Sequence, residues 1–273
     1  MLASLHPSRA MRVAIVVPTL NEESTIARTL PAAQAALAAL VSREPLAAGS
    51  ELVVADGGSR DRTVAVARAL GARVVAGPAG RGGQLNRGAA ATTAEILLFL
   101  HADTTLPEGG LAAILATIDG KRDGNRDGNR DGNRGGGRGG DGTKAAAQPA
   151  IGGAFLVRFD QGGPLLRLGA WLINQRTRAT RLPLGDQAHF VTRTAFEQLG
   201  GYRDWPILED LDFAWRLRRH GRTVILRQRV TTGARRFVEL GVARTVATNW
   251  LIWLLFVAGV SPRRLARFYG QVR

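Results

Sequence analysis

The chain has 273 residues, 45% of them hydrophobic, and a formal net charge of +15. A chain of this length and composition can bury a sizeable core, and one large α/β domain is the first expectation. It contains no cysteine, which excludes a disulfide framework, a thiolate metal site and redox chemistry at sulfur.

The positive charge suggests two kinds of binding partner, nucleic acid and an anionic membrane surface. The sequence has no RNA-binding signature and no basic run interleaved with aromatic residues, so nucleic acid is not an expected partner. No apolar stretch long enough for a secretory signal precedes Met11, which favours a cytoplasmic location. Contact with the inner face of a membrane stays open.

Short β-branched runs alternate with helical patterns along the first hundred residues. This alternation predicts a mostly parallel, Rossmann-like sheet with helices on both faces. In chain order the pattern predicts a strand at 12–18, a helix at 21–40, a strand at 51–61 ending in a glycine turn, a helix at 62–71 capped by Ser59 or Asp61 and closed by Gly71, a strand at 72–77, a helix at 81–93 and a strand at 95–101.

The alternation stops at a low-complexity insert, residues 122–144. It repeats the tetrapeptide RDGN three times and continues as a glycine- and arginine-rich run. With nothing apolar to bury, such a segment cannot offset the entropy cost of becoming ordered. We therefore expect a disordered insert within the domain, with an RNA-binding Gly/Arg tract as the less favoured alternative.

Regular elements resume after the insert. The last of them begins with acidic residues and ends with basic ones, as the helix dipole favours. The expected elements are a strand at 151–160, a helix at 164–182, a strand, short helix and glycine turn over 188–202, and a helix at 208–221.

The C-terminal part carries an apolar helix at 249–262. Its dozen or so apolar residues fall short of the roughly 20 needed to span a bilayer. It is either a buried core helix or an interfacial segment, and flanking arginines suit anionic headgroups. The chain thus divides into a domain at 11–235 and a helical tail at 236–273, possible membrane contact being confined to the tail. The flanking arginines are Arg244, Arg263, Arg264 and Arg267.

Three carboxylates follow the ends of predicted strands. Glu22 follows the first strand, Asp56 ends the second and Asp103 follows the fourth. Ligands bind outside the carboxyl ends of parallel strands, so these acids are expected at one edge. Asp103 with His101 is a candidate site for Mn²⁺ or Mg²⁺, because alternate residues leaving a strand can reach one ion. Alternatively, Asp103 caps a helix begun by Pro107 and His101 is merely buried.

Glu209 and Asp210 stand at the start of the predicted helix 208–221. Acids at this position are favoured by the helix dipole alone. A carboxylate at a helix start beside a cleft is also well placed to take a proton from an acceptor hydroxyl. Both interpretations remain open from these two residues.

Five stretches together form a family pattern. They are VVPTLNE at 16–22, ELVVADGGSRDRT at 51–63, GRGGQLNRGA at 80–89, LFLHADT at 98–104 and FEQLGGYRDWPILEDLDFAWRLRRHG at 196–221. With these motifs the chain resembles the family-two glycosyltransferases, inverting enzymes of the GT-A fold. The resemblance implies transfer of a sugar from a nucleotide-diphosphate sugar, UDP-sugar favoured, to an acceptor hydroxyl, with Mn²⁺ or Mg²⁺ as cofactor.

The resemblance also implies roles for residues at matching positions. Asp210 is the general base, with Glu209 beside it, and Asp103 binds the metal together with His101 in a D-x-D-like motif. The implied nucleotide-binding residues are Pro18, Thr19, Glu22, Asp56 and Arg81. The implied contacts to the donor sugar, diphosphate or acceptor are Gln84, Asn86, Gly185, Asp186, Gln187 and either Arg235 or Arg236.

Two positions depart from the family pattern. Gly57 follows Asp56 where a second acid is common, and His101 replaces the first acid of the D-x-D-like motif. An imidazole can still bind Mn²⁺, so metal use remains the expectation. A non-catalytic nucleotide-sugar-binding protein of the same fold is the first alternative. A sugar nucleotidyltransferase is disfavoured, because PTLNEEST at 18–25 replaces the glycine-rich phosphate loop of such enzymes.

A narrower likeness concerns three segments. LHADT at 100–104, TRLPLGDQAHFV at 180–191 and VTTGARR at 230–236 are similar to a bacterial subgroup associated with selenium-linked radical enzymes or described as arsenosugar-biosynthesis-like. That likeness implies no particular acceptor.

Overall fold

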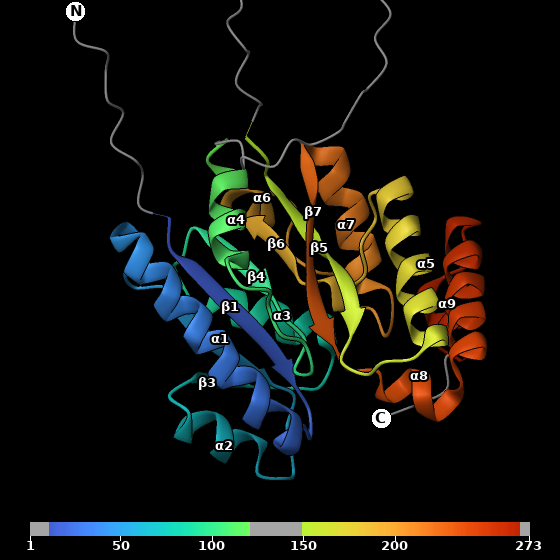
Figure 1. The fold of residues 1–273 in the computed structure, drawn as a ribbon, viewed down its shortest axis with the longest axis horizontal. Helices are drawn as coiled ribbons and strands as arrows, with labels where there is room; N and C mark the ends of the chain where they lie inside the picture. Colours follow the sequence, from blue (N-terminus) through green and yellow to red (C-terminus); the bar gives the residue numbers. More distant parts are fainter. Residues whose placement is uncertain (1–10, 121–148, 268–273) are drawn as a thin grey trace, which may run out of the picture.

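The computed structural model describes residues 11–120 and 149–267, which form a seven-stranded sheet (Figure 1). The strand order is β3-β2-β1-β4-β6-β5-β7, and β6 alone among the described strands runs antiparallel to its neighbours. The predicted α/β fold with a mostly parallel sheet is confirmed. The strands are β1 Val13–Thr19, β2 Glu51–Asp56, β3 Arg73–Ala76, β4 Ile96–Phe99, β5 Gly152–Phe159, β6 His189–Thr192 and β7 Thr223–Thr232.

Helices cover both faces of the sheet because successive side chains of a strand point to opposite faces. Val13, Ile15 and Val17 of β1 pack with α1, α2, α4 and α5, whereas Ala14 and Val16 pack with α3, α6 and α7. The helices are α1 Glu23–Arg43, α2 Thr63–Ala69, α3 Arg81–Ala90, α4 Gly110–Ile118, α5 Pro164–Thr180, α6 Arg193–Gln198, α7 Glu209–His220, α8 Arg235–Leu240, α9 Val242–Val257 and α10 Pro262–Ala266, with the 3-10 helices η1 Pro45–Ala47 and η2 Gly185–Gln187.

The sequence pattern did not predict strand β7, which pairs with β5 at the edge of the sheet. Phe155 of β5 lies opposite Leu226, but the next residue, Leu156, lies opposite Arg229. Two extra residues of β7 therefore bulge out of the ladder at a polar stretch, residues 227–229. The bulge breaks the apolar alternation by which strands are recognised.

Helix starts settle two expectations. Helix α4 begins at Gly110, so the alternative that Asp103 caps a helix is wrong. At α2 the N-cap residue is Arg62 and makes no side-chain cap, so the expected capping by Ser59 or Asp61 is wrong. Asp61 lies one residue earlier and accepts a hydrogen bond from the backbone N–H of Thr63 at 2.9 Å. Gly71, with φ of +73°, follows this helix in the left-handed region that glycine favours.

The predicted insert at 122–144 lies outside the described residues. The C-terminal helices are described, and they pack on the main core. The ring of Phe237 in α8 lies 4.5 Å from that of Phe159 between centroids. Val242 and Val246 of α9 border the same core, and α9 runs beside α5 (Figure 1). The division into a domain and a tail at residue 235 stays a prediction.

The apolar tail is a surface helix. Thr245 and Ile252 are the buried residues of α9, whereas Leu251, Leu254 and Val257 are exposed. The expectation of a buried core helix is wrong, because one side of α9 faces the protein and the other faces outward. In the part of the chain that the structure describes, no helix has the length and apolar character needed to cross a membrane.

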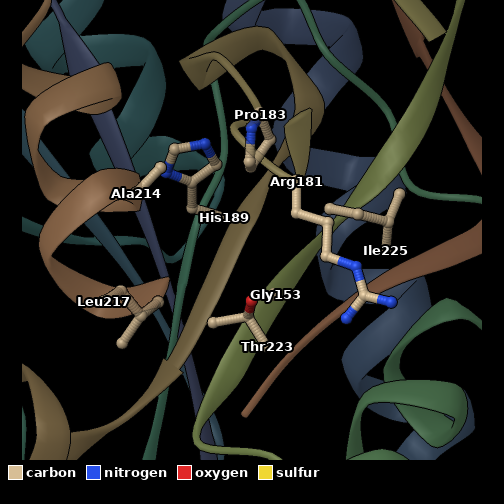
Figure 2. A pocket seen from close by; sticks show the side chains of 8 residues that line it. All are labelled: Gly153, Arg181, Pro183, His189, Ala214, Leu217, Thr223 and Ile225. Carbon is tan, nitrogen blue, oxygen red and sulfur yellow. The ribbon is translucent and has the colours of Figure 1, made fainter. Parts of the chain in front are cut away.

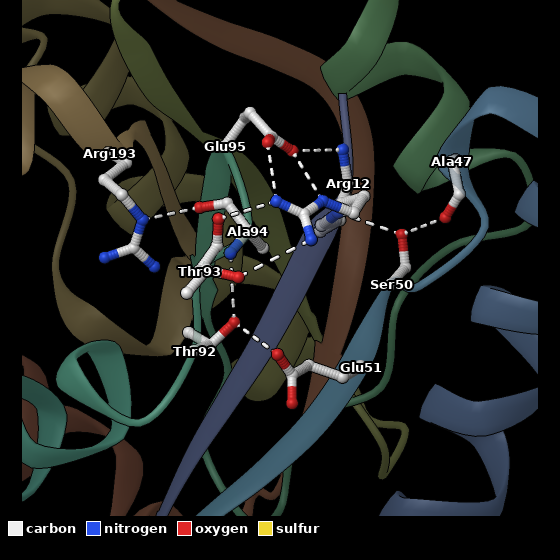
Figure 3. Close-up of polar contacts among 10 residues, drawn as sticks. Arg12, Ala47, Ser50, Glu51, Thr92, Thr93, Ala94, Glu95 and Arg193 are labelled. Atoms are coloured by element: carbon white, nitrogen blue, oxygen red, sulfur yellow. Dashed lines mark hydrogen bonds and ion pairs between the residues drawn. The ribbon is translucent and has the colours of Figure 1, made fainter. Parts of the chain in front are cut away.

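Arg12 and Glu95 join β1 to β4 at the amino edge of the sheet (Figure 3). The Glu95 carboxylate accepts hydrogen bonds from the backbone N–H of Arg12 at 2.8 Å and from its guanidinium at 2.7 and 3.1 Å. The guanidinium hydrogen bond is the largest effect and, against the opposing effect of burial, lowers the pKa of Glu95 to about 2. This ion pair therefore stabilises the folded state while Glu95 is ionised.

We expect Glu95→Gln to lower the melting temperature by a few degrees at neutral pH, because an amide pairs less strongly with a guanidinium. The pKa of Glu95 is lowered by folding from 4.5 to about 2. Its stabilisation is thus present above the unfolded pKa and is lost as the pH falls through the folded value.

The difference in melting temperature between wild type and variant should accordingly shrink as the pH falls below about 4. Glu197→Gln is the matched control, because Glu197 also pairs with an arginine but its side chain is 63% exposed. A Glu95→Gln effect no larger than the control's would contradict the prediction.

Candidate active site at the carboxyl edge of the sheet

Polar side chains gather at the carboxyl edge of the sheet around β1 and β4. The strand order reverses between these two strands, and such switch points form ligand-binding crevices in open α/β sheets. The start of α3, the start of α7 and the short helix η2 border the same edge. Residues from distant parts of the sequence thus converge here.

Asp56 ends β2 with a carboxylate that organises the following turn. It accepts hydrogen bonds from the backbone N–H groups of Gly58 and Ser59 at 2.8 and 2.9 Å, and from the Thr19 hydroxyl at 3.2 Å. The Ser59 hydroxyl donates to it as well. Burial acts to raise the pKa of Asp56, but these hydrogen bonds outweigh it and lower the pKa. A carboxylate has about four acceptor sites, so all are engaged.

The side-chain amides of Gln84 and Asn86 form hydrogen bonds with backbone groups of the protein. The Gln84 amide donates to the carbonyls of Thr19 and Ala55 at 2.8 and 2.9 Å, which joins α3 to the ends of β1 and β2. The Asn86 amide donates to the carbonyl of Tyr202 at 2.8 Å and accepts from its N–H at 2.9 Å. Both side chains therefore fix the frame of the site, and their contact with a sugar stays a prediction.

The loop after β4 that carries Asp103 is held by the end of β7. Thr105 exchanges backbone hydrogen bonds of 2.8 and 3.0 Å with Thr231. A Cβ on Gly233 would lie 2.8 Å from Oδ2 of Asp103, so the carboxylate packs directly against this glycine. Burial raises the pKa of Asp103, although a hydrogen bond from the Thr104 hydroxyl opposes the shift.

His101, Gly185 and Asp210 meet at one point of the site. A Cβ on Gly185 would lie 2.7 Å from Nε2 of His101 and 3.1 Å from Oδ2 of Asp210. The backbone N–H of Gly185 donates to the same Oδ2 at 2.5 Å, and the N–H of Leu211 donates to Oδ1 at 2.7 Å. Burial lowers the pKa of His101 well below its usual value, so the imidazole is neutral.

Glu209 is buried beside this cluster. Its Oε1 lies 3.7 Å from the guanidinium of Arg81 at the start of α3. Burial, followed by the charge of Asp210, raises the pKa of Glu209 to about 7, while Arg81 acts in the opposite direction. The preceding residue, Leu208, has a φ of +63°, a strained conformation for a non-glycine residue that is typical of functional sites.

Arg176 of α5 is a site residue that the sequence interpretation missed. It is 6% exposed, and it interacts electrostatically with Asp186 and Asp210. Burial raises the pKa of Asp186 to about 6, although the charge of Arg176 opposes this shift. Thr177 donates a hydrogen bond to Gln187 at 2.8 Å, which attaches α5 to η2. An arginine on the apolar side of an amphipathic helix was the available signal.

Further acids and arginines surround Asp103. Burial, and to a lesser degree the charge of Asp103, raises the pKa of Glu22, while Arg235 lowers it. Asp160, which the sequence interpretation also missed, follows β5, forms an ion pair with Arg28 at 3.7 Å and raises the pKa of Asp103. In residues 11–120 and 149–267, no group of three or more His, Asp or Glu side chains is arranged to hold a metal. A cation at Asp103 would therefore depend on oxygen atoms of a bound ligand.

A small pocket lies apart from this acidic cluster (Figure 2). His189 at the start of β6 lines it, and its cavity volume of about 10 Å³ has room for one water molecule. The pocket is too small for a nucleotide or a sugar, so it does not compete with the carboxyl edge as the candidate site. Its lining residues are Gly153, Arg181, Pro183, His189, Ala214, Leu217, Thr223 and Ile225.

Solved structures share this fold. A mannosyltransferase from Pyrobaculum calidifontis, in complex with GDP-Man and Mn²⁺, has a TM-score of 0.59 and 18% identity, covering 94% of this chain and 67% of that one. Glucosyl-3-phosphoglycerate synthase from Mycobacterium tuberculosis, in complex with Mn²⁺, UDP and phosphoglyceric acid, has a TM-score of 0.53 and 22% identity, covering 92% and 80%. These likenesses confirm the expected GT-A fold.

Curated relatives match a shorter part of the chain. Glucosyl-3-phosphoglycerate synthase of Mycolicibacterium smegmatis is 36% identical over an alignment of 117 residues, and the match covers 39% of this chain and 36% of the relative. An uncharacterized glycosyltransferase of Mycobacterium tuberculosis is 35% identical over 108 residues, 39% of this chain and 44% of the relative. The chain thus matches less than half of the length of these relatives.

The narrower likeness to the selenium-linked or arsenosugar-like subgroup stays a prediction. The family itself is shown by a family model, described as glycosyl transferase family 2, that matches residues 14–179. This range includes β1 to β4 and nearly all of α5. The chain therefore belongs to glycosyl transferase family 2.

Proposed function

We propose that this protein transfers a sugar from a nucleotide-diphosphate sugar, with a UDP-sugar favoured, to an acceptor hydroxyl and inverts the anomeric carbon. Membership of glycosyl transferase family 2 supports sugar transfer. The observation that carries the finer proposal is the meeting of His101, Gly185 and Asp210 at the carboxyl edge. Structural neighbours that hold UDP or GDP-Man with Mn²⁺ support the donor class.

Asp210 is the proposed general base. It takes the proton of the acceptor hydroxyl, whose oxygen attacks the anomeric carbon on the face opposite the diphosphate. The bond between the anomeric carbon and the diphosphate oxygen then breaks, and the configuration inverts. Hydrogen bonds from the N–H groups of Gly185 and Leu211 fix the orientation of the carboxylate. Glu209 pairs with Arg81 at the start of α3, and Arg81 is proposed to face the diphosphate.

Asp103 and His101 are the proposed holders of Mn²⁺ or Mg²⁺. The donor set fits such an ion, because Asp103 offers a carboxylate and burial keeps His101 a neutral imidazole with a free lone pair. A divalent cation would neutralise charge on the diphosphate leaving group. Glu22 lies beside this position, since it interacts electrostatically with Asp103 and with Arg235.

The nucleotide is proposed to lie along the ends of β1 and β2, over Pro18, Thr19 and Asp56. Because Asp56 already accepts hydrogen bonds from Thr19, Gly58 and Ser59, its supported role is to shape the turn that lines the pocket. Direct contact between Asp56 and the base would require it to give up one of these bonds. Asp186 of η2 is proposed to face the sugar or the acceptor. Gln187 is fully buried and its amide is bonded to Thr177, Leu184 and Phe155, so its supported role is to hold η2 in place.

A non-catalytic nucleotide-sugar-binding protein is the second candidate, because His101 stands where the family pattern has an acid. Two measurements separate the transferase from the non-catalytic binding protein. The first is calorimetric titration with UDP and with GDP, each with and without Mn²⁺, and the second is a donor-hydrolysis assay. Metal-dependent binding with hydrolysis supports the transferase, and binding without any turnover supports the second candidate. The proposed location is the cytoplasm.

Asp210→Asn should lower the transfer rate by about 100-fold or more, because it removes the base. The amide oxygen can still accept one of the two backbone hydrogen bonds that Gly185 and Leu211 donate, and the side chain keeps its size, so the fold of the site should be retained. UDP binding by calorimetry should stay within about twofold of wild type, since the base acts only in the chemical step. Near-normal turnover in this variant would show that another group takes the proton.

Asp103→Asn should weaken UDP binding in the presence of Mn²⁺ by about tenfold or more, which corresponds to about 1.4 kcal/mol. An amide is a poorer ligand than a carboxylate for a hard cation. UDP binding without metal should change little in the same titration. An equal loss with and without Mn²⁺ would mean that Asp103 shapes the pocket and holds no metal.

Arg176→Met should raise the pKa of Asp186 further, because it removes the buried positive charge that opposes the effect of burial there. A limb of the pH–rate profile that reports Asp186 should move to higher pH, because this carboxyl group beside the proposed base then stays protonated over a wider pH range. Arg176→Lys should restore most of the wild-type profile. Arg167→Met, an exposed change on the same helix, is the control. An unshifted profile in Arg176→Met would rule out this role.

A further inference from the structure

Helices α5 and α9 lie side by side (Figure 1). Each of them carries exposed apolar side chains. On each helix the exposed residues are spaced by three, so they follow one side of that helix. Trp171 of α5 is 54% exposed and Leu251 of α9 is 56% exposed. We name this surface the α5–α9 face, and it comprises Leu165, Leu168, Trp171, Leu251, Leu254 and Val257.

Arginines extend the two apolar stripes. Arg178 follows Trp171 by seven residues and Arg244 precedes Leu251 by seven, so each lies two turns along the same side of its helix. Both arginines are exposed, as are Arg263 and Arg264 of α10, which packs against α9. The sequences of α5, α9 and α10 contain no Asp or Glu. The charge on these helices is therefore exclusively positive.

We propose that the α5–α9 face binds the surface of an anionic lipid bilayer. An apolar stripe with cationic residues along its borders is the pattern of helices that lie in the headgroup region. Trp171 adds an amphipathic ring of the kind that favours this region. A second copy of the chain fits less well, since two such faces, whose own helices carry only positive charges, repel each other within a Debye length.

The inner side of α9 connects this surface to the candidate active site. Trp253 and Phe256 of α9 pack against an apolar cluster of Leu182, Leu211 and Ala214, and Leu184 and Leu208 pack against the same cluster. Leu184 and Leu208 directly precede Gly185 and Glu209, so α9 shares this cluster with both loops of the site. A bilayer bound to the outer side of α9 lies one helix away from them. The lipid contact itself requires no sugar transfer and is tested without a donor.

The test is flotation of the full chain with vesicles on a density gradient. One set of vesicles contains phosphatidylcholine alone, and the other contains phosphatidylcholine mixed with phosphatidylglycerol. We expect the protein to float with the mixed vesicles at low salt, and the bound fraction to fall as salt screens the arginines. Equal flotation with both sets would overturn the assignment of an anionic lipid, and no flotation with either would overturn the whole proposal.

Variants locate the surface. The double substitution Leu251→Asp with Leu254→Asp should reduce the bound fraction at least fivefold, and Arg244→Glu should reduce it and weaken its dependence on salt. Leu46→Asp is the matched control for the first change, because Leu46 is 51% exposed on η1 after α1. Arg43→Glu, at the end of α1, is the control for the second.

Circular dichroism and melting temperature show whether each variant is folded. A folded double variant that floats like wild type would place the contact elsewhere. Sedimentation without vesicles tests the second-copy alternative, and a wild-type dimer that the double variant converts to a monomer would overturn the bilayer proposal. Asp210→Asn should float like wild type, so failure of sugar transfer and failure of lipid binding are separable.

Discussion

The candidate site depends on the absence of a side chain at Gly185. Any side chain there would collide with His101 from the β4 loop and crowd Asp210 from α7. With glycine, three segments far apart in the sequence come into contact, and the backbone N–H of residue 185 reaches the Asp210 carboxylate. The orientation of the proposed base is thus fixed by a backbone group, which cannot rotate away as a side chain can.

A second level of contacts holds these segments in place. Thr105 and Thr231 tie the β4 loop to β7, and Thr177 ties η2 to α5 through Gln187. Asn86 fixes the turn at Tyr202 that leads toward α7. These residues do not need to touch a substrate to matter. They set the relative positions of groups that approach from opposite faces of one sheet, where small displacements are costly to catalysis.

The sequence predicted the alternating fold and the convergence of acids at one edge because both follow from local pattern and from the rules of parallel sheets. It did not predict β7, because a polar bulge hides that strand, and therefore it missed what holds Asp103. Arg176 and Asp160 were missed because their roles depend on burial beside other charges. The occupied amides of Gln84 and Asn86 likewise became apparent only from their partners, which lie far away in the sequence.

The carboxylates around Asp103 repel one another when no ligand is bound. Glu22 and Asp103 each have a pKa raised first by burial. The charge of Asp103 adds to the shift of Glu22, and the charge of Asp160 adds to the shift of Asp103. A divalent cation reverses the repulsive part of these shifts, because it favours the ionised form of every carboxylate around it. The diphosphate of a donor in turn supplies the oxygen ligands that the described residues lack. Binding of metal and donor at this edge should therefore be mutually reinforcing and should release protons, since each removes the cost of burying the other's charge.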